Sequence, residues 1–152
     1  MDAVAYIDPA VISFINESFV PVRVQASDPV YGPRYRVKWT PTLLLTDSKG
    51  VEKYRTLGFY PPGELVPSLL LGMGKAFFDA PDRPAARKCF GRIIDEFPRS
   101  PQAGEAIYLS GVANYIETHD VTNLINIYDR LAADYPQDIW LTRADPYRLL
   151  KH

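Results

Sequence analysis

The second half of this 152-residue chain repeats itself, and the repeat limits the possible folds more than any other feature. Two aromatic residues and a proline stand at intervals of 13 and 8 residues in each of two copies: Phe77, Phe90 and Pro98, then Tyr115, Tyr128 and Pro136. Such a repeat is typical of stacked helix pairs, in which an aromatic side chain of one helix fills a groove on its neighbour and a proline ends the second helix.

Before residue 60 the sequence has a different pattern. Asp8-Pro9 and the apolar spacing that follows predict a helix over 8–17. Alternation in FVPVRV predicts a strand over 19–24, and the apolar run in TPTLLLTD predicts a buried strand. The turn residues DSKG and the alternation over 51–57 complete a hairpin, which ends at Gly58. The sequence therefore predicts α/β structure followed by α structure, with the change near residue 60.

Composition excludes several classes of function. Lys and Arg number 17 against 18 acidic residues, so no net charge attracts nucleic acid. The apolar runs fall short of the roughly 20 residues that cross a bilayer, and no secretion signal opens the chain, so we expect a cytoplasmic protein without a membrane span. One cysteine, Cys89, and two histidines exclude an internal disulfide and a metal cluster, and we expect no cofactor.

The repeated region resembles tetratricopeptide repeats. Residues 67–100 carry the small, aromatic, small, aromatic and proline positions of that family, at Gly74, Phe77, Ala86, Phe90 and Pro98. The repeat period of 38 residues exceeds the family's usual length of roughly 34. We assign residues 67–138 to two such helix pairs. Because about three repeats are normally needed for stability, we expect residues 139–152 to form a C-terminal cap.

Residues 1–66 resemble the second half of a thioredoxin-fold domain. The shared order is a helix, a strand, a short helix, the sequence Thr40-Pro41-Thr42, a hairpin and a glycine at Gly58. The resemblance implies that Pro41 is cis and that Thr40 offers its backbone to an extended peptide, in a peptide-binding site formed by Trp39, Thr40, Pro41 and Gly58. Two alternatives stand for Trp39, which either lines this site or packs into the core.

The chain departs from the thioredoxin pattern because the Cys-x-x-Cys segment, with the strands and helix around it, has no counterpart after Met1. No catalytic residue is therefore assigned, and Cys89 is expected to be a buried filler. Our hypothesis is a truncated chain whose longer parent, periplasmic if it carries a signal peptide, held those thiols. Without the intervening strand, 19–24 and 41–46 must close the gap, pair with another chain or stay exposed, so homodimerisation is also predicted.

These features predict a protein that binds a protein or an extended peptide. The thioredoxin resemblance implies that the longer parent is a thiol-disulfide oxidoreductase, although this chain lacks the attacking thiolate and the resolving thiol that disulfide exchange needs. The alternative is a non-catalytic chaperone-like or scaffolding protein that uses the tetratricopeptide-like repeats.

Overall fold

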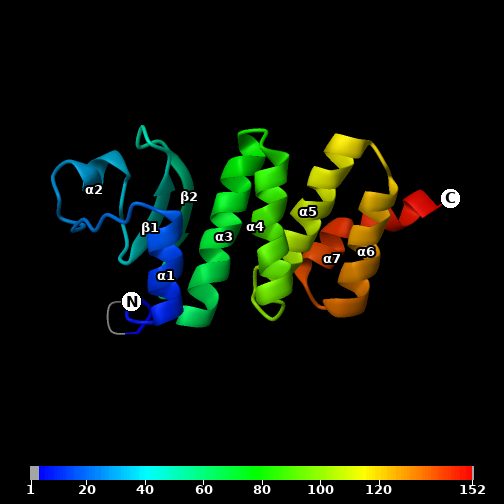
Figure 1. Ribbon diagram of the computed structural model, residues 1–152, viewed down its shortest axis with the longest axis horizontal. Coiled ribbons are helices and arrows are strands. Elements are labelled where there is room, and N and C mark those ends of the chain that lie inside the picture. The colour runs from blue at the N-terminus through cyan, green and yellow to red at the C-terminus, as the bar shows by residue number, and fades with distance from the viewer. Residues whose placement is uncertain (1–3, 152) are drawn as a thin grey trace.

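A computed structural model describes residues 4–151 of the chain. A two-stranded antiparallel sheet and two short helices precede a row of longer helices (Figure 1). The elements are α1 (Pro9–Ser18), α2 (Tyr31–Arg34), β1 (Thr42–Thr46), β2 (Glu52–Leu57), α3 (Pro62–Asp79), α4 (Arg83–Glu96), α5 (Ala103–Thr118), α6 (Thr122–Asp134), α7 (Ile139–Ala144) and the 3-10 helix η1 (Asp145–Lys151). The predicted order of α/β structure followed by α structure is confirmed. Within residues 4–151 no helix is long and apolar enough to cross a membrane.

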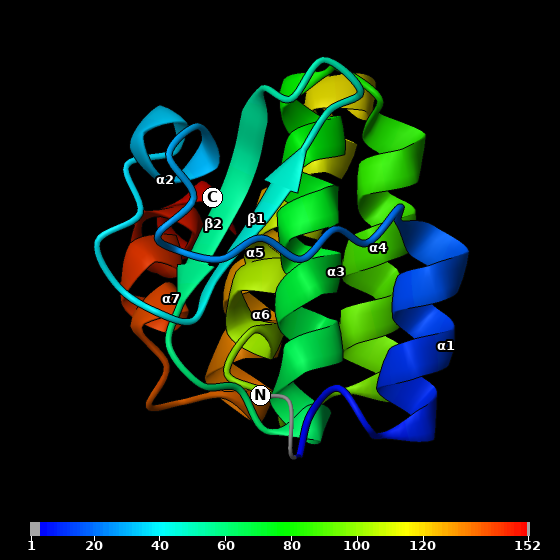
Figure 2. The same ribbon diagram turned by 90° about the vertical axis from the view of Figure 1, so that its left-hand side faces the viewer.

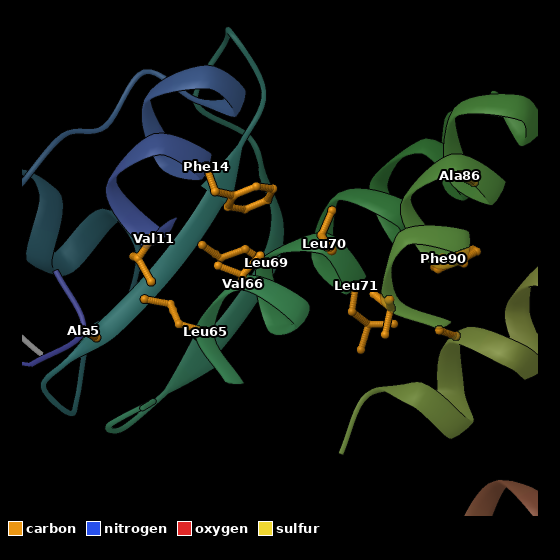
Figure 3. Packing of buried hydrophobic residues seen from close by; sticks show 12 residues of the cluster. Ala5, Val11, Phe14, Leu65, Val66, Leu69, Leu70, Leu71, Ala86 and Phe90 are labelled. Atoms are coloured by element: carbon orange, nitrogen blue, oxygen red, sulfur yellow. The ribbon is translucent and has the colours of Figure 1, made fainter. Parts of the chain in front are cut away.

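Helix α1 forms where the sequence predicts it. The Asp8 side chain accepts hydrogen bonds from the backbone N–H groups of Ala10 and Val11, and Pro9 occupies the first turn. Val11 and Phe14 are buried. Figure 3 shows them facing the leucines of α3, so burial of this apolar stripe fixes α1 against α3.

The strand predicted over 19–24 is wrong. This segment forms no strand in the structure, and Val20 and Val22 are 91% and 80% exposed. Figure 2 shows the connection from α1 to α2 crossing in front of the hairpin, on the side away from α3. The physical reason is the absence of a neighbouring strand in the described residues, because alternating valines form a strand only beside a partner that takes their backbone hydrogen bonds.

The predicted hairpin is confirmed. β1 and β2 pair antiparallel, with Leu43 opposite Thr56 and Leu45 opposite Tyr54, and a register shift follows Leu45. Asp47 accepts hydrogen bonds from the backbone of Lys49 and Val51, which fixes the turn between the strands. Leu43 and Leu45 pack against the main core, so this face of the hairpin covers α3.

Helix α3 is the centre of the molecule. Its residues 65–72 are all buried, and it contacts α1, the hairpin and α4. A Cβ atom at Gly72 would overlap the Tyr54 ring and lie 2.8 Å from Leu45 Cδ1, so only a glycine lets the sheet approach this closely. The helix also runs across the predicted boundary at residue 66, and the assignment of the units on either side of it stays a prediction.

Two helix pairs, α3–α4 and α5–α6, follow one another as the repeat predicts (Figure 1). In the first pair the ring of Phe90, which is fully buried, lies against Gly74. In the second pair Ile127, rather than the predicted Tyr128, is buried against a glycine, Gly111, while the tyrosine is half-buried. An aliphatic residue one position earlier thus fills the groove.

The C-terminal residues cover the second helix pair. Trp140, Leu141 and Tyr147 pack against the smaller core of α5 and α6, and the hydroxyl groups of Tyr108 and Tyr147 lie 2.8 Å apart. Burial raises the pKa of Tyr147 far above its usual range, because the phenolate loses hydration there. The packing supports a capping role for the described part of 139–152.

Candidate functional site

The predicted peptide-binding residues meet at the start of the hairpin. The Thr40-Pro41 peptide bond is cis, which confirms the geometry implied by the resemblance. The backbone N–H of Gly58 donates to the Pro41 carbonyl at 2.9 Å, and Thr42 Oγ1 donates to the Trp39 carbonyl at 2.6 Å. Pro41 and Gly58 are therefore held together, and Gly58 adopts a positive φ of 88° that favours glycine.

Trp39 lies on the surface. It is 67% exposed, so the alternative that places it in the core is wrong. An open hollow lies beside it, lined by Ala26, Val37, Lys38, Trp39 and Thr40. Phe59, which is not among the predicted site residues, is 56% exposed directly after Gly58. The one sequence signal that could have identified Phe59 is its position directly after the glycine that ends a strand.

The outer edge of β1 carries polar backbone groups that face away from β2. In an antiparallel pair, alternate residues exchange hydrogen bonds with the partner strand and the others point outward. The bonds from Gly58 N–H to Pro41 and from Asp47 N–H to Val51 show that the odd-numbered residues face β2. The backbone groups facing outward are those of Thr42, Leu44 and Thr46.

No other strand covers this edge in the described part of the chain. The sheet there contains β1 and β2 alone, and no backbone hydrogen bond from another segment of residues 4–151 reaches Thr42, Leu44 or Thr46. Residues 40–46 also lack any charged side chain. Thr42 and Leu44 are half-buried and Thr46 is exposed. An uncharged edge without a partner strand offers donors and acceptors at strand spacing to an extended backbone.

The segment around α2 holds the hairpin from its turn side. The Tyr35 hydroxyl donates to the Gly50 carbonyl at 2.9 Å, and the Arg55 guanidinium donates to the Tyr35 carbonyl. Arg55 also pairs with Glu52 at 2.7 Å, and this pair lowers the pKa of the Glu52 carboxyl through a direct hydrogen bond. These contacts hold the segment before Trp39 against the hairpin, so the backbone on both sides of the site is fixed in place.

The carboxylates near the site serve as caps for turns. A hydrogen bond from the Tyr31 backbone N–H, followed by one from Val30, lowers the pKa of Asp28. The Val51 N–H has the same effect on the pKa of Asp47. Across residues 4–151 no group of three His, Cys, Asp or Glu side chains is placed to hold a metal ion. The arrangement supports binding through backbone and apolar contacts.

Cys89 lies away from the site. It is 7% exposed on α4, among the buried residues that face the helix core. Burial raises the pKa of its thiol, and this effect outweighs the positive charges of Arg92 and Lys88. The expectation that Cys89 is a buried filler is confirmed.

We therefore expect native Cys89 to resist alkylation. At pH 8, iodoacetamide should modify it roughly 100-fold or more slowly than the urea-unfolded chain, because the thiolate is both disfavoured and shielded in the fold. Mass spectrometry of timed samples measures both rates. Equal rates in the folded and unfolded chains would contradict the buried position.

Comparison with known proteins gives no relative for this chain. No protein-family model, no curated protein and no solved structure matches it. The function of the chain is therefore inferred from its own residues and contacts.

Proposed function

We propose that this chain binds an extended polypeptide segment at the turn of residues 39–41 and along the outer edge of β1. The observation that carries the proposal is the outward-facing backbone of Thr42, Leu44 and Thr46, for which the described chain supplies no partner strand. Strand addition to an open edge is a recurring mode of peptide recognition, in which main-chain hydrogen bonds supply the affinity.

Apolar side chains at the start of the edge add to the binding. Trp39, two residues before Pro41, and Phe59, directly after Gly58, both expose large rings near the hydrogen bond that joins Pro41 and Gly58. Such rings bury much area at a small cost in side-chain entropy. Because the edge itself is uncharged, we expect a preference for extended segments with small β-branched or apolar side chains.

The proposed role is binding. Disulfide exchange needs an accessible thiolate and a resolving thiol, and the chain offers only the buried Cys89. In thiol-disulfide exchange this chain would position the substrate peptide, and the thiols would have to come from outside it. The same edge is also open to a second copy of the chain.

Binding of a model peptide tests the proposal. The probe is a fluorescein-labelled octapeptide of alternating threonine and valine, and fluorescence anisotropy measures its affinity. We expect saturable binding in the micromolar to millimolar range, which is weak because ordering the peptide costs free energy. Methylation of every backbone amide nitrogen in the peptide should abolish binding, because it removes the donors on both edges of the extended peptide.

Substitutions locate the binding surface. Trp39→Ala should raise the dissociation constant of the peptide at least about fivefold, which corresponds to the loss of roughly 1 kcal/mol of contact with the ring. Ile139→Ala is the matched control, because Ile139 is also exposed but lies on α7 at the other end of the chain. If both variants bind the peptide like the original chain, the hairpin is not the binding surface, and a scaffolding role of the helix pairs becomes the better explanation.

A further inference from the structure

We propose that two copies of this chain pair through the outer edges of their β1 strands, antiparallel, about a two-fold axis at Leu44. The result is a continuous four-stranded sheet in the order β2, β1, β1 and β2. The inference requires no peptide ligand and stands independently of the proposed function, although it uses the same edge.

The direction of the backbone groups fits this pairing. In a hydrogen-bonded antiparallel pair, both residues must point their N–H and C=O groups toward the partner. Pairing at the axis places Leu44 opposite Leu44 of the second copy, and Thr42 opposite Thr46 of the second copy. All three residues face outward, as the bonds within the hairpin show. Two hydrogen bonds form at the axis, and two form in each flanking pair.

The sequence of β1 reads the same in both directions. The strand is TLLLT, so antiparallel pairing about its middle residue places threonine opposite threonine and leucine opposite leucine. Leu43 of one copy lies opposite Leu45 of the other, on the face that packs against α3 in each copy. Like β-branched and apolar neighbours across a strand pair stabilise a sheet, and a two-fold interface requires this kind of self-complementarity.

The charges permit the contact. Edge strands are usually protected by lysines, prolines or inward-pointing charges, but residues 42–46 contain none of these. No like charges therefore face one another at the axis.

The area of the interface limits its affinity. Five-residue strands alone bury less than the roughly 1,200–2,000 Å² of a standard interface. Trp39 before β1, and Val20 and Val22 on the connection that crosses the hairpin, add exposed apolar area. We expect a dimer with a dissociation constant in the micromolar range.

A pair of charge variants at the axis tests the geometry. Sedimentation velocity of the unmodified chain, from about 5 to 500 µM, should show a monomer-dimer equilibrium. Leu44→Lys and Leu44→Glu should each stay monomeric, because two like charges then meet at the axis. Their equimolar mixture should dimerise again, because lysine now lies opposite glutamate.

Leu57 provides the matched control. It lies on β2 opposite Thr42, is 54% exposed, and carries its side chain on the same face as Leu44, but it is not on the outer edge. Leu57→Lys and Leu57→Glu should each dimerise like the unmodified chain. A monomeric original chain at 500 µM, no recovery in the mixture of Leu44 variants, or equal loss in the Leu57 variants would each overturn the proposal.

A cysteine variant at the axis gives a second test, which applies even if the charge variants fail to fold. Cα atoms in a hydrogen-bonded antiparallel pair lie about 5.5 Å apart, which is within the range that a disulfide spans. Leu44→Cys should therefore form a covalent dimer under mild oxidation, whereas Leu57→Cys should not. Cys89 does not compete, because it is buried. Failure of the Leu44→Cys chain to form the covalent dimer would overturn the proposal.

The two proposals fail separately. Because a peptide and a second copy would occupy the same edge, the threonine-valine peptide should dissociate the dimer. Dimerisation without peptide binding would refute the proposed function and leave the self-pairing intact. Peptide binding by a chain that never dimerises would refute the self-pairing and leave the proposed function intact.

Discussion

Replacement of Phe90 by alanine should lower the free energy of unfolding by about 3–5 kcal/mol, the cost of removing a fully buried phenylalanine. The ring has no exposed surface and fills the space beside Gly74, between α3 and α4. Removal of the ring leaves a cavity that the two helices cannot close without losing other contacts. Urea denaturation followed by circular dichroism measures the change.

Phe59 is the matched control for this substitution. Phe59→Ala removes the same atoms from a residue that is more than half exposed, so it should cost no more than about 1 kcal/mol. Since natural domains are stable by about 5–15 kcal/mol in total, the Phe90 variant should approach unfolding, while the Phe59 variant remains folded. Equal losses in the two variants would show that Phe90 is not in the core.

Gly72→Ala and Gly91→Ala should change stability in opposite directions. Alanine is favoured over glycine within a helix by about 1 kcal/mol, and Gly91 on α4 has open space around its Cβ position. Gly91→Ala should therefore stabilise the chain by up to about that amount. At Gly72 the added methyl group meets the Tyr54 ring and Leu45, and overpacking of this kind costs about 1–3 kcal/mol.

Thermal unfolding of both variants beside the original chain measures the two effects. The Gly72 variant should also bind the threonine-valine peptide more weakly, because the added methyl group pushes the hairpin away from α3. Stabilisation of the chain by both substitutions would mean that the sheet and α3 are not in close contact at Gly72.

Local sequence signals predicted much of this fold. The helix over 8–17 has its cap in Asp8 and Pro9, and the hairpin has its turn in Asp47 and Gly50, so neighbouring residues determine both elements. The repeated helix pairs were also visible, because their spacing depends on the helical period alone. The site residues around Pro41 were identified through a family resemblance, and their binding role remains a prediction.

Features that depend on distant residues were missed. The segment 19–24 has the composition of a strand, but whether it forms one depends on a neighbour that its own residues do not specify. The sequence left both alternatives open for Trp39, because an exposed and a buried tryptophan look the same in a sequence. The shift from Tyr128 to Ile127 is set by where Gly111 lets α5 approach α6, which is a matter of packing in three dimensions.

Residues of helix α3 pack against both the hairpin and the helix pairs, and this shared packing affects how the chain unfolds. Leu65 faces α1, Gly72 contacts the sheet and Gly74 receives the ring of Phe90, all within ten residues of one rigid element. We therefore expect the hairpin and the helix pairs to unfold as one cooperative unit. A molecule that occupies the edge of β1 then stabilises the distant helices by mass action, so the melting temperature of the whole chain reports on events at the hairpin.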